Sequence, residues 1–589
     1  MRKILFIFSL FFSIIFTVTN TSAQETATQA DAQLAAKEQQ KKALELLSLT
    51  TSEVKSLKIP ENRILLLSQA AGLWWKYDEK EARSLIQEIS VTLKSLLSNP
   101  ETNHPQHRLS WSRRTLRQQV IQLIARYDLE LALEVLRNTR PASPAGETAQ
   151  KEISDQEISL EQSLAAQAAS TNPAAALKLA EKTLEKGFSY ELSRLVEIIA
   201  EKDRPAAAKF LDQSLKKLQS QKVLPDNQST YFVLNILRQE FRAQKKEVRP
   251  SDSMYGIKLR EPILELDDLK KWNEAAIQIA VRAQHTAESI KDQNSYALLT
   301  GLQQLLPDIE KYNPEYVSVI NKSLARLMPL LPEHAKDNVE LNRLLQKGDV
   351  EGLLAAAEKA PKDKKDNLYV NAVFAAINVQ ADFDLARKII NNNITDPNRK
   401  KDQIALVEWV AAQARAIEGK IDEAIASLAG LENDATRADT MASIAESVLQ
   451  TGNKKSAAQL LERAFQFLDG KIETAEEFRA AAHITRVFVE ADPKRAFDIY
   501  ELPIDPLNLT VNALTVICRY DNSSRCFSVK DELMIVANLT FTQSIVSYLE
   551  TMKSLGGQDF KQASEIAGGF SNLEIRSYAR LRILEAVLN

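Results

Sequence analysis

The sequence is poor in the residues that interrupt helices and build turns. Its 589 residues include only 15 glycines and 19 prolines, whereas alanine, leucine, lysine, glutamate and glutamine are abundant. Sheet proteins need frequent turns made from glycine, proline and asparagine, and the abundant residues here are strong helix formers. This balance argues against an all-β architecture and predicts far more helix than the roughly one third of an average domain.

Residues suited to acid–base or metal chemistry are also scarce. The chain has five histidines and two cysteines, and it contains no HExxH, GxSxG, GxGxxG, CxxC or phosphate-loop motif. His104 and His107 have only Glu101 as an acidic neighbour, which favours a solvated pair over metal ligands. Paired carboxylates such as Asp267 and Asp268 are ordinary in a chain with 78 acidic residues. We therefore predict no catalytic, metal-binding or cofactor-binding residues.

The first 23 residues have the layout of a secretory signal peptide. A basic start at Arg2 and Lys3 is followed by an apolar run over 4–18 and by small residues up to Ala23. The alternative is an uncleaved anchor helix, but the run is shorter than the roughly 20 residues that a membrane span needs. We expect cleavage after Ala23 and export to the periplasm or the medium, with no integral membrane segment left.

The remaining chain is mildly acidic. Without the signal segment it has 73 basic and 78 acidic residues, a formal charge of −5. This balance argues against nucleic acid or anionic lipid as the partner. Its length exceeds what one compact core usually holds, so the chain must form several domains or an extended repeat stack.

An eight-residue phrase recurs along the chain. It begins with an apolar residue, carries Asp or Asn at its fourth position and ends with Ala. The Asp or Asn side chain can cap a helix by accepting bonds from the unpaired amides of the first turn, and the small Ala lets two helices approach closely. Each phrase therefore predicts a tight turn between antiparallel helices. The examples are 75–82, 125–132, 169–176, 200–207, 379–386 and 489–496.

Later turns have the spacing of a helical-repeat protein. Asp349, Asp382, Lys420, Asn453 and Asp492 follow one another at intervals of 33, 38, 33 and 39 residues. Helix pairs of this length stack into an α-solenoid.

One hairpin carries a family resemblance. The stretch 441–464 resembles a tetratricopeptide repeat, with small Ala445, Ala457 and Ala464 and large Leu461 at the spacing of that family. The other hairpins lack its Trp-Leu-Gly-Tyr signature, and the period varies. The resemblance implies architecture rather than activity. We predict an all-α fold, an irregular α-solenoid of stacked antiparallel helical hairpins.

Changes in composition divide this expected solenoid into parts. Residues 24–42 form a polar leader, and 43–244 form an N-terminal helical-repeat arm. The run 245–270, rich in proline and glycine, is expected to be an insert or linker before a C-terminal arm over 271–589. Within that arm, 502–529 combines prolines with β-branched residues and is expected to be irregular.

A basic cluster with one aromatic ring is a candidate binding patch. Arginine presents a bidentate fork and tryptophan a stacking face, so the cluster could hold an acidic peptide or a glycan acid. The alternative places the tryptophan in the core with solvated arginines around it. The cluster comprises Arg108, Trp111, Arg113, Arg114 and Arg117.

Stacked hairpins without a catalytic motif favour a binding role. The leading hypothesis is a protein-binding or scaffolding module of the cell envelope, with a protein or peptide partner. One alternative is an enzyme acting on glycans or peptidoglycan through scattered carboxylates on a helical scaffold. Another is a structural assembly factor in which loops matter more than any groove.

The two cysteines generate a first prediction. Cys518 and Cys526 flank Asp521, Asn522 and Ser523, which favour a turn, and an even cysteine count in an exported chain suggests a disulfide. We expect a Cys518–Cys526 bridge that stabilises the loop by about 2 kcal/mol, because the closed loop is short. The alternative is two free thiols, with Cys518 on a buried apolar face. Mass spectrometry of the unreduced, alkylated protein decides this, since two alkylated thiols would remove the bridge.

Overall fold

The computed structural model describes most of the chain and is almost wholly helical there. The described part is 84% helical, which confirms the predicted fold class, and its two strands form one short antiparallel ladder. It comprises residues 34–98, 106–140, 147–221, 224, 226–245, 260–282, 293–327, 341, 344–345, 349–377, 382–431, 433–470, 472–520, 528–529, 531–535 and 540–589.

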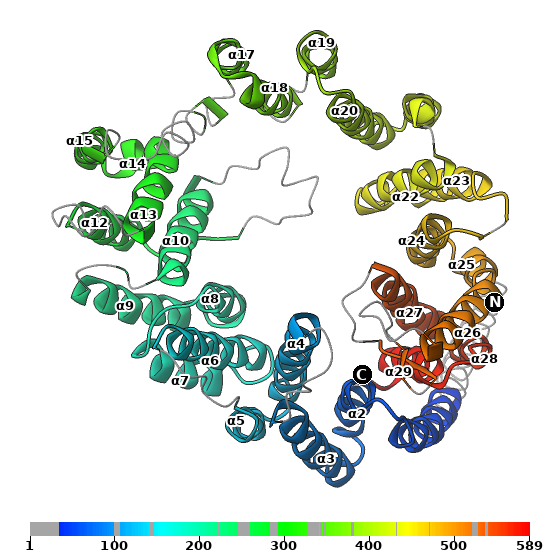
Figure 1. Ribbon diagram of the computed structural model, residues 1–589. Helices are drawn as coiled ribbons and strands as arrows, with labels where there is room; N and C mark the ends of the chain where they lie inside the picture. Colours follow the sequence, from blue (N-terminus) through cyan, green and yellow to red (C-terminus); the bar gives the residue numbers. More distant parts are fainter. Residues whose placement is uncertain are drawn as a thin grey trace, which may run out of the picture. The chain divides into compact units, whose positions relative to one another are not determined.

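The chain folds into two compact units, and the described residues nearest both ends of the chain belong to the first one. The division falls within α3 (Glu79–Ser98) and α4 (Gln106–Ala125), and again at Gly470. The other elements of the first unit are a helix over 34–55, α2 (Pro60–Trp74), α24 (Ala475–Ala491), α25 (Pro493–Glu501), α26 (Ile504–Tyr520), β1 (Ser528–Val529), β2 (Glu532–Leu533), α27 (Thr540–Gln558), α28 (Phe560–Gly568) and α29 (Leu573–Leu588) (Figure 1).

The second unit is a succession of helices in chain order. These are α5 (Leu129–Asn138), α6 (Glu147–Ala168), α7 (Pro173–Leu184), α8 (Glu191–Lys202), α9 (Arg204–Ser220), α10 (Asn227–Lys245), α12 (Leu266–Arg282), α13 (Gln293–Gln304), α14 (Leu306–Tyr312), η3 (Pro314–Tyr316), α15 (Val317–Leu327), α17 (Val350–Lys359), α18 (Lys362–Ala375), α19 (Phe383–Asn393), α20 (Pro397–Ile417), α21 (Ile421–Ser427), η6 (Leu428–Gly430), α22 (Asp434–Gln450) and α23 (Lys454–Gln466) (Figure 1).

The recurring phrase forms the predicted capped turn. The Asp128 carboxylate accepts a hydrogen bond from the Leu131 amide at 2.9 Å, and Asn172 and Asp203 cap α7 and α9 in the same way. Pro173 takes the first position of its helix, where its missing amide hydrogen costs nothing. Equivalent bonds are made by Asp78, Asp349, Asp382, Asn453 and Asp492. Lys420, which precedes α21, provides no side-chain cap.

The alanine that ends each phrase lies in the core. All six are fully buried, which fits their predicted role in letting paired helices approach closely: Ala82, Ala132, Ala176, Ala207, Ala386 and Ala496.

A further capped turn differs from the recurring phrase at its first position. Asp559 caps α28 through the Gln562 amide, and Ala563 is fully buried. The first position of this phrase is Gly556, where the pattern requires an apolar side chain. A Cβ there would lie 2.9 Å from the Ile583 Cα, so the backbones of α27 and α29 approach too closely for any side chain.

Contacts between alternate helices make the second unit a repeat stack. α6 pairs with α7 and also contacts α8, and α20 and α21 pair together while contacting α22 and α23 respectively. Residues 441–464, predicted as one hairpin, form parts of α22 and α23, with Ala445, Ala457 and Ala464 buried. The helical-repeat architecture expected from the sequence is therefore present.

Helices reach both ends of the run 245–270, since α10 ends at Lys245 and α12 begins at Leu266, and the core lies on both sides of it. One apolar cluster continues from Ala165 to Leu324, and α10 packs against α12 across the run. Glu240 is fully buried and accepts 2.9 Å bonds from the amides of Ile263 and Leu264, which ties the described end of the run to α10. The division into two arms stays a prediction.

The expectation of an irregular segment was wrong where the structure describes it. Most of 502–529 is helical, because α26 covers Ile504–Tyr520. Residues 34–42, in the expected polar leader, are mostly exposed and lie in the helix over 34–55. Pro506 lies in the first turn of α26, where a proline removes no internal hydrogen bond, so it begins a helix rather than breaking one.

Buried polar groups join the two chain ends in the first unit. The Glu532 carboxylate accepts hydrogen bonds from the backbone amide of Lys58 at 2.6 Å and from the side-chain amide of Asn62 at 2.9 Å. Asn62 also bonds the backbone of Leu533, whose own amide donates to Glu574 at 2.9 Å. The β1–β2 ladder is therefore fixed between the N-terminal helices and α29, which itself packs against α2.

This cluster predicts a pH-dependent stability. Burial raises the pKa of Glu574 to about 7, and the nearby Glu532 charge adds to the rise. A carboxyl whose pKa is higher in the folded state contributes stability that is complete below about pH 4.5 and is lost as the pH rises through about 7. We expect the melting temperature to fall between pH 5 and pH 8. In Glu574→Gln, the loss of unfolding free energy over this range should be smaller by up to about 3 kcal/mol.

The measurement is thermal unfolding followed by circular dichroism at several pH values. Glu565→Gln, on an exposed side chain of α28 in the same unit, is the matched control and should leave the pH dependence unchanged. An unaltered pH profile in Glu574→Gln would contradict the prediction.

Candidate protein-binding surface

The outer face of α26 carries a strip of exposed apolar side chains. Leu509 is 72% exposed, Ile517 58% and Tyr520 87%. Positions separated by three, four, seven and eleven residues share one face of a helix, so Leu509, Ala513, Val516 and Tyr520 form a continuous line with Ile517 beside it. Leu502, which lies between α25 and α26, is also exposed. We call Leu502, Leu509, Ala513, Val516, Ile517 and Tyr520 the α26 strip.

The opposite face of α26 holds the helix on its unit. Ile504, Leu507 and Val511 are buried, and the helix packs against β1 and β2. Asn508 fixes the N-terminal half, because its side chain donates to the Gly569 carbonyl at 2.9 Å and accepts from the Ser571 amide at 3.0 Å. The strip is therefore presented on an anchored helix, and it is not the side through which the helix packs.

A tyrosine pair fixes the end of α25, from which α26 follows. Tyr500 and Tyr548 are both fully buried, and their rings stack at 4.1 Å. Each hydroxyl donates to the other residue's backbone carbonyl, at 3.2 Å for Tyr500. These reciprocal bonds satisfy two buried donors and lock α25 to α27.

The α26 strip carries a signal in the sequence, although it was not predicted. The spacing of Leu509, Val516 and Tyr520 is helical, but the prolines at 503 and 506 led to an irregular assignment. Apolar residues on both faces of α26 also hide its amphipathic pattern. Only the tertiary structure shows which face is covered.

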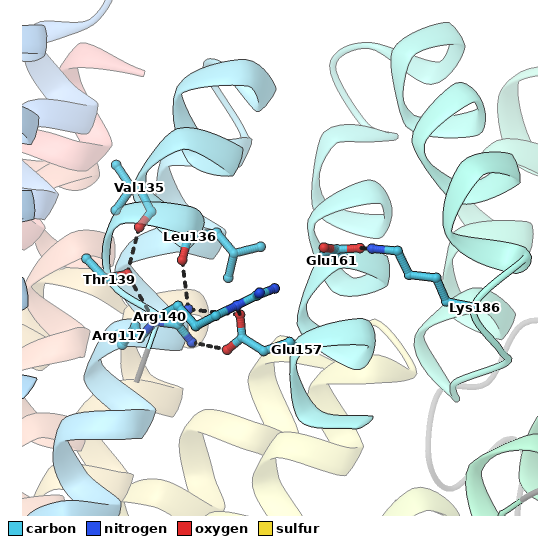
Figure 2. A network of polar contacts seen from close by, with 8 residues as sticks. All are labelled: Arg117, Val135, Leu136, Thr139, Arg140, Glu157, Glu161 and Lys186. Carbon is cyan, nitrogen blue, oxygen red and sulfur yellow. Dashed lines mark hydrogen bonds and ion pairs between the residues drawn. The ribbon is translucent and has the colours of Figure 1, made fainter. Parts of the chain in front are cut away.

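The predicted basic patch is not one surface. Arg117 is 5% exposed and lies in a buried network with Glu157, to whose carboxylate Nη1 donates at 2.7 Å (Figure 2). Its Nε donates to Thr139 at 3.0 Å, and Nη2 donates to the Leu136 carbonyl at 3.0 Å. Arg117 therefore joins α4, α5 and α6, and it is unavailable to a surface ligand.

The other described members of the patch differ in exposure. Arg114 is exposed and Arg113 half-buried, whereas the side chains of Arg108 and Trp111 lie outside the described residues. The division between the two units also falls between Ser112 and Arg113. The alternative with solvated arginines fails for Arg117, and binding by the remaining members stays a prediction.

The predicted disulfide is partly outside the described residues. Cys518 is half-buried near the end of α26, and its neighbours Val516 and Ile517 are exposed, so it does not lie on a buried apolar face. Cys526 is outside the described residues, and the bridge stays a prediction.

Buried carboxylates give no open acid–base site in the described part of the chain. Glu532 and Glu574 interact electrostatically, but both are at most 5% exposed and accept bonds from backbone amides. Substrate has no access to carboxyls held in this way. Among the described residues, no group of three or more histidine, cysteine or acidic side chains could hold a metal ion. No described helix combines the length and apolar character needed to cross a membrane.

The Arg117 network generates a stability prediction. Arg117→Met removes the buried guanidinium partner of Glu157 and leaves its carboxylate only the 3.5 Å ion pair with the exposed Arg140. Losing the buried partner of such a carboxylate typically costs about 3 kcal/mol. The double variant Arg117→Met, Glu157→Leu should recover much of this loss, because apolar replacement removes both buried charges. Urea unfolding measures both, and Arg114→Met, on the exposed neighbour, should change stability by less than about 0.5 kcal/mol. Equal losses in the single and double variants would contradict the role assigned to the pair.

Comparison with known proteins gives no family for this chain. No family model and no curated protein match the sequence. Among solved structures, a homology model of the full-length AP-3 complex in an intermediate open conformation is 11% identical, over 93% of this chain and 90% of that chain, with a TM-score of 0.29. A circular tandem repeat protein with novel repeat topology and enhanced subunit contact surfaces is 15% identical, over 93% and 98%, with a TM-score of 0.15. Likeness at these TM-scores supports no inference about shared arrangement or function.

Proposed function

We propose that this helical-repeat protein is an exported scaffold that binds a protein partner through the α26 strip. The observation that carries the proposal is the exposure of large apolar side chains along one face of an anchored helix. Such a continuous patch is unusual on a soluble protein and is characteristic of protein contact sites. Tyr520 adds a large ring at one end of the strip, and tyrosine is among the residues that contribute most to binding energy at interfaces.

The geometry of the strip suits a helical or flat apolar partner. Anchors at three-, four- and seven-residue spacing are the pattern by which one helix is recognised by another protein surface. The surrounding exposed groups include Glu501, Asp505 and Asn512, so the strip has a polar rim. A fixed helix also reduces the ordering entropy that binding must overcome.

Export is the second part of the proposal and rests on the sequence. The signal layout over 1–23 supports delivery to the periplasm or the medium, and a Cys518–Cys526 bridge would form in such an oxidising compartment. The bridge would join the end of α26 to the segment that follows it. The protein-binding strip and the expected disulfide would then belong to the same part of the chain.

Site-specific cross-linking tests the proposal. We expect a photo-reactive residue at position 520 to give a discrete adduct in the cells that make the protein, because Tyr520 is the most exposed member of the strip. The same residue at position 561, on an exposed side chain of α28, is the control and should give none. Leu509→Asp should abolish the adduct at 520, since a desolvated carboxylate opposes binding to an apolar partner. The proposal fails if the adduct survives Leu509→Asp or forms equally at 561.

A further inference from the structure

The α26 strip has a polar edge whose order of charges is complementary to itself when the direction of the helix is reversed. Asp505, Asn512 and Arg519 are separated by seven residues each, and all three are exposed. A spacing of seven residues is close to two helical turns, so these side chains form one row beside the apolar line. The row reads acid, amide, base over a length of about 21 Å.

We propose that the occupant of the strip is the α26 strip of a second copy of this chain, in an antiparallel pair. This inference rests on the proposed function and names its partner. A twofold axis at the level of Asn512, perpendicular to the helices, keeps the same edge of both helices together and reverses their direction. Asp505 of each copy then meets Arg519 of the other, and the two Asn512 amides meet at the axis.

The apolar side chains obey the same symmetry. Leu509 and Val516 lie at nearly equal distances from Asn512, so each Leu509 faces the Val516 of the second copy. Ala513, next to the axis, is small enough to let the two helices approach closely at their crossing point. A parallel twofold pair would instead place the two rows on opposite edges of the contact, so Asp505 and Arg519 of the two copies would not meet.

Arg519 can bind Asp531 of its own chain and Asp505 of a second copy at the same time. Its Nε donates to Asp531 at 2.5 Å on the same chain. A guanidinium has five donors in a planar fork, so a second carboxylate can be bound beside the first. Exposed Arg519 is thereby held at the end of α26, where the Asp505 of a second copy arrives.

Oligomeric state against concentration tests the inference. Sedimentation of the full-length mature protein should show a monomer–dimer equilibrium. Asp505→Arg should raise the dimer dissociation constant at least about tenfold, because it brings two guanidiniums together at both ends of the pair. Arg519→Asp should do the same with two carboxylates.

Mixing the two charge-reversed variants gives the most specific test. Asp505→Arg mixed with Arg519→Asp should form a heterodimer of near wild-type affinity, because both opposite-charge contacts are restored in the mixed pair. The cis double variant Asp505→Arg, Arg519→Asp should restore the homodimer. Lys561→Glu, a charge reversal on α28, is the control and should leave the dimer unchanged. If Arg519→Asp loses its fold by circular dichroism, Asn512→Arg replaces it and should weaken the dimer without touching the Asp531 contact.

The inference is overturned if the protein is monomeric at all concentrations, if these variants leave the dimer unchanged, or if mixing restores nothing. Binding of the monomer to neutral phosphatidylcholine vesicles through the strip would also overturn it. An adduct at position 520 that contains another protein, with a strictly monomeric chain, refutes the self-pairing while the proposed function stands. Absence of any adduct refutes the proposed function itself.

Discussion

The whole architecture depends on a short capped turn. At each turn formed by the recurring phrase, a carboxylate or amide oxygen accepts a hydrogen bond from the backbone amide three residues ahead, as Asp128 does from Leu131. The helix begins there because the bond satisfies a donor that would otherwise lose its partner on burial. A fully buried alanine one turn later brings the two helices together. Repeated along the chain, this local device yields antiparallel hairpins without long loops or sheets.

Local turns do not decide how the hairpins stack. Buried polar side chains help to determine the stacking. Glu240 accepts backbone amides from the segment before α12, and Arg117 bonds a carbonyl at the end of α5 while pairing with Glu157 on α6. Glu532 does the same for the segment that opens α2. In each case a buried charged group satisfies backbone groups that a connection must leave unpaired, so it fixes that connection to its neighbour.

In α26, by contrast, large apolar side chains remain exposed. Elsewhere in the first unit the large apolar residues are mostly buried, as with Tyr500 and Tyr548 in the core. In α26 the inner face is packed while Leu509, Ile517 and Tyr520 face outward. Leaving such side chains in water forgoes roughly 1.5–3 kcal/mol for each, which is a cost to solubility and stability without a compensating contact. A binding role supplies that contact.

The sequence by itself determined the class of fold, the capped turns and the residues that face the preceding helix. These features depend on bonds between residues three or four apart, so the information is contained in a short window. Gly556 shows the limit of such a window, since only the distant Ile583 explains why a glycine is needed there. Arg117 shows it again, because an arginine in a basic cluster has no local sign that Glu157, 40 residues away, will bury it. The β1–β2 segment is fixed by bonds between residues more than 470 positions apart, such as Glu532 and Lys58. Which face of α26 remains in water was likewise decided only by tertiary packing, because both of its faces are apolar in the sequence.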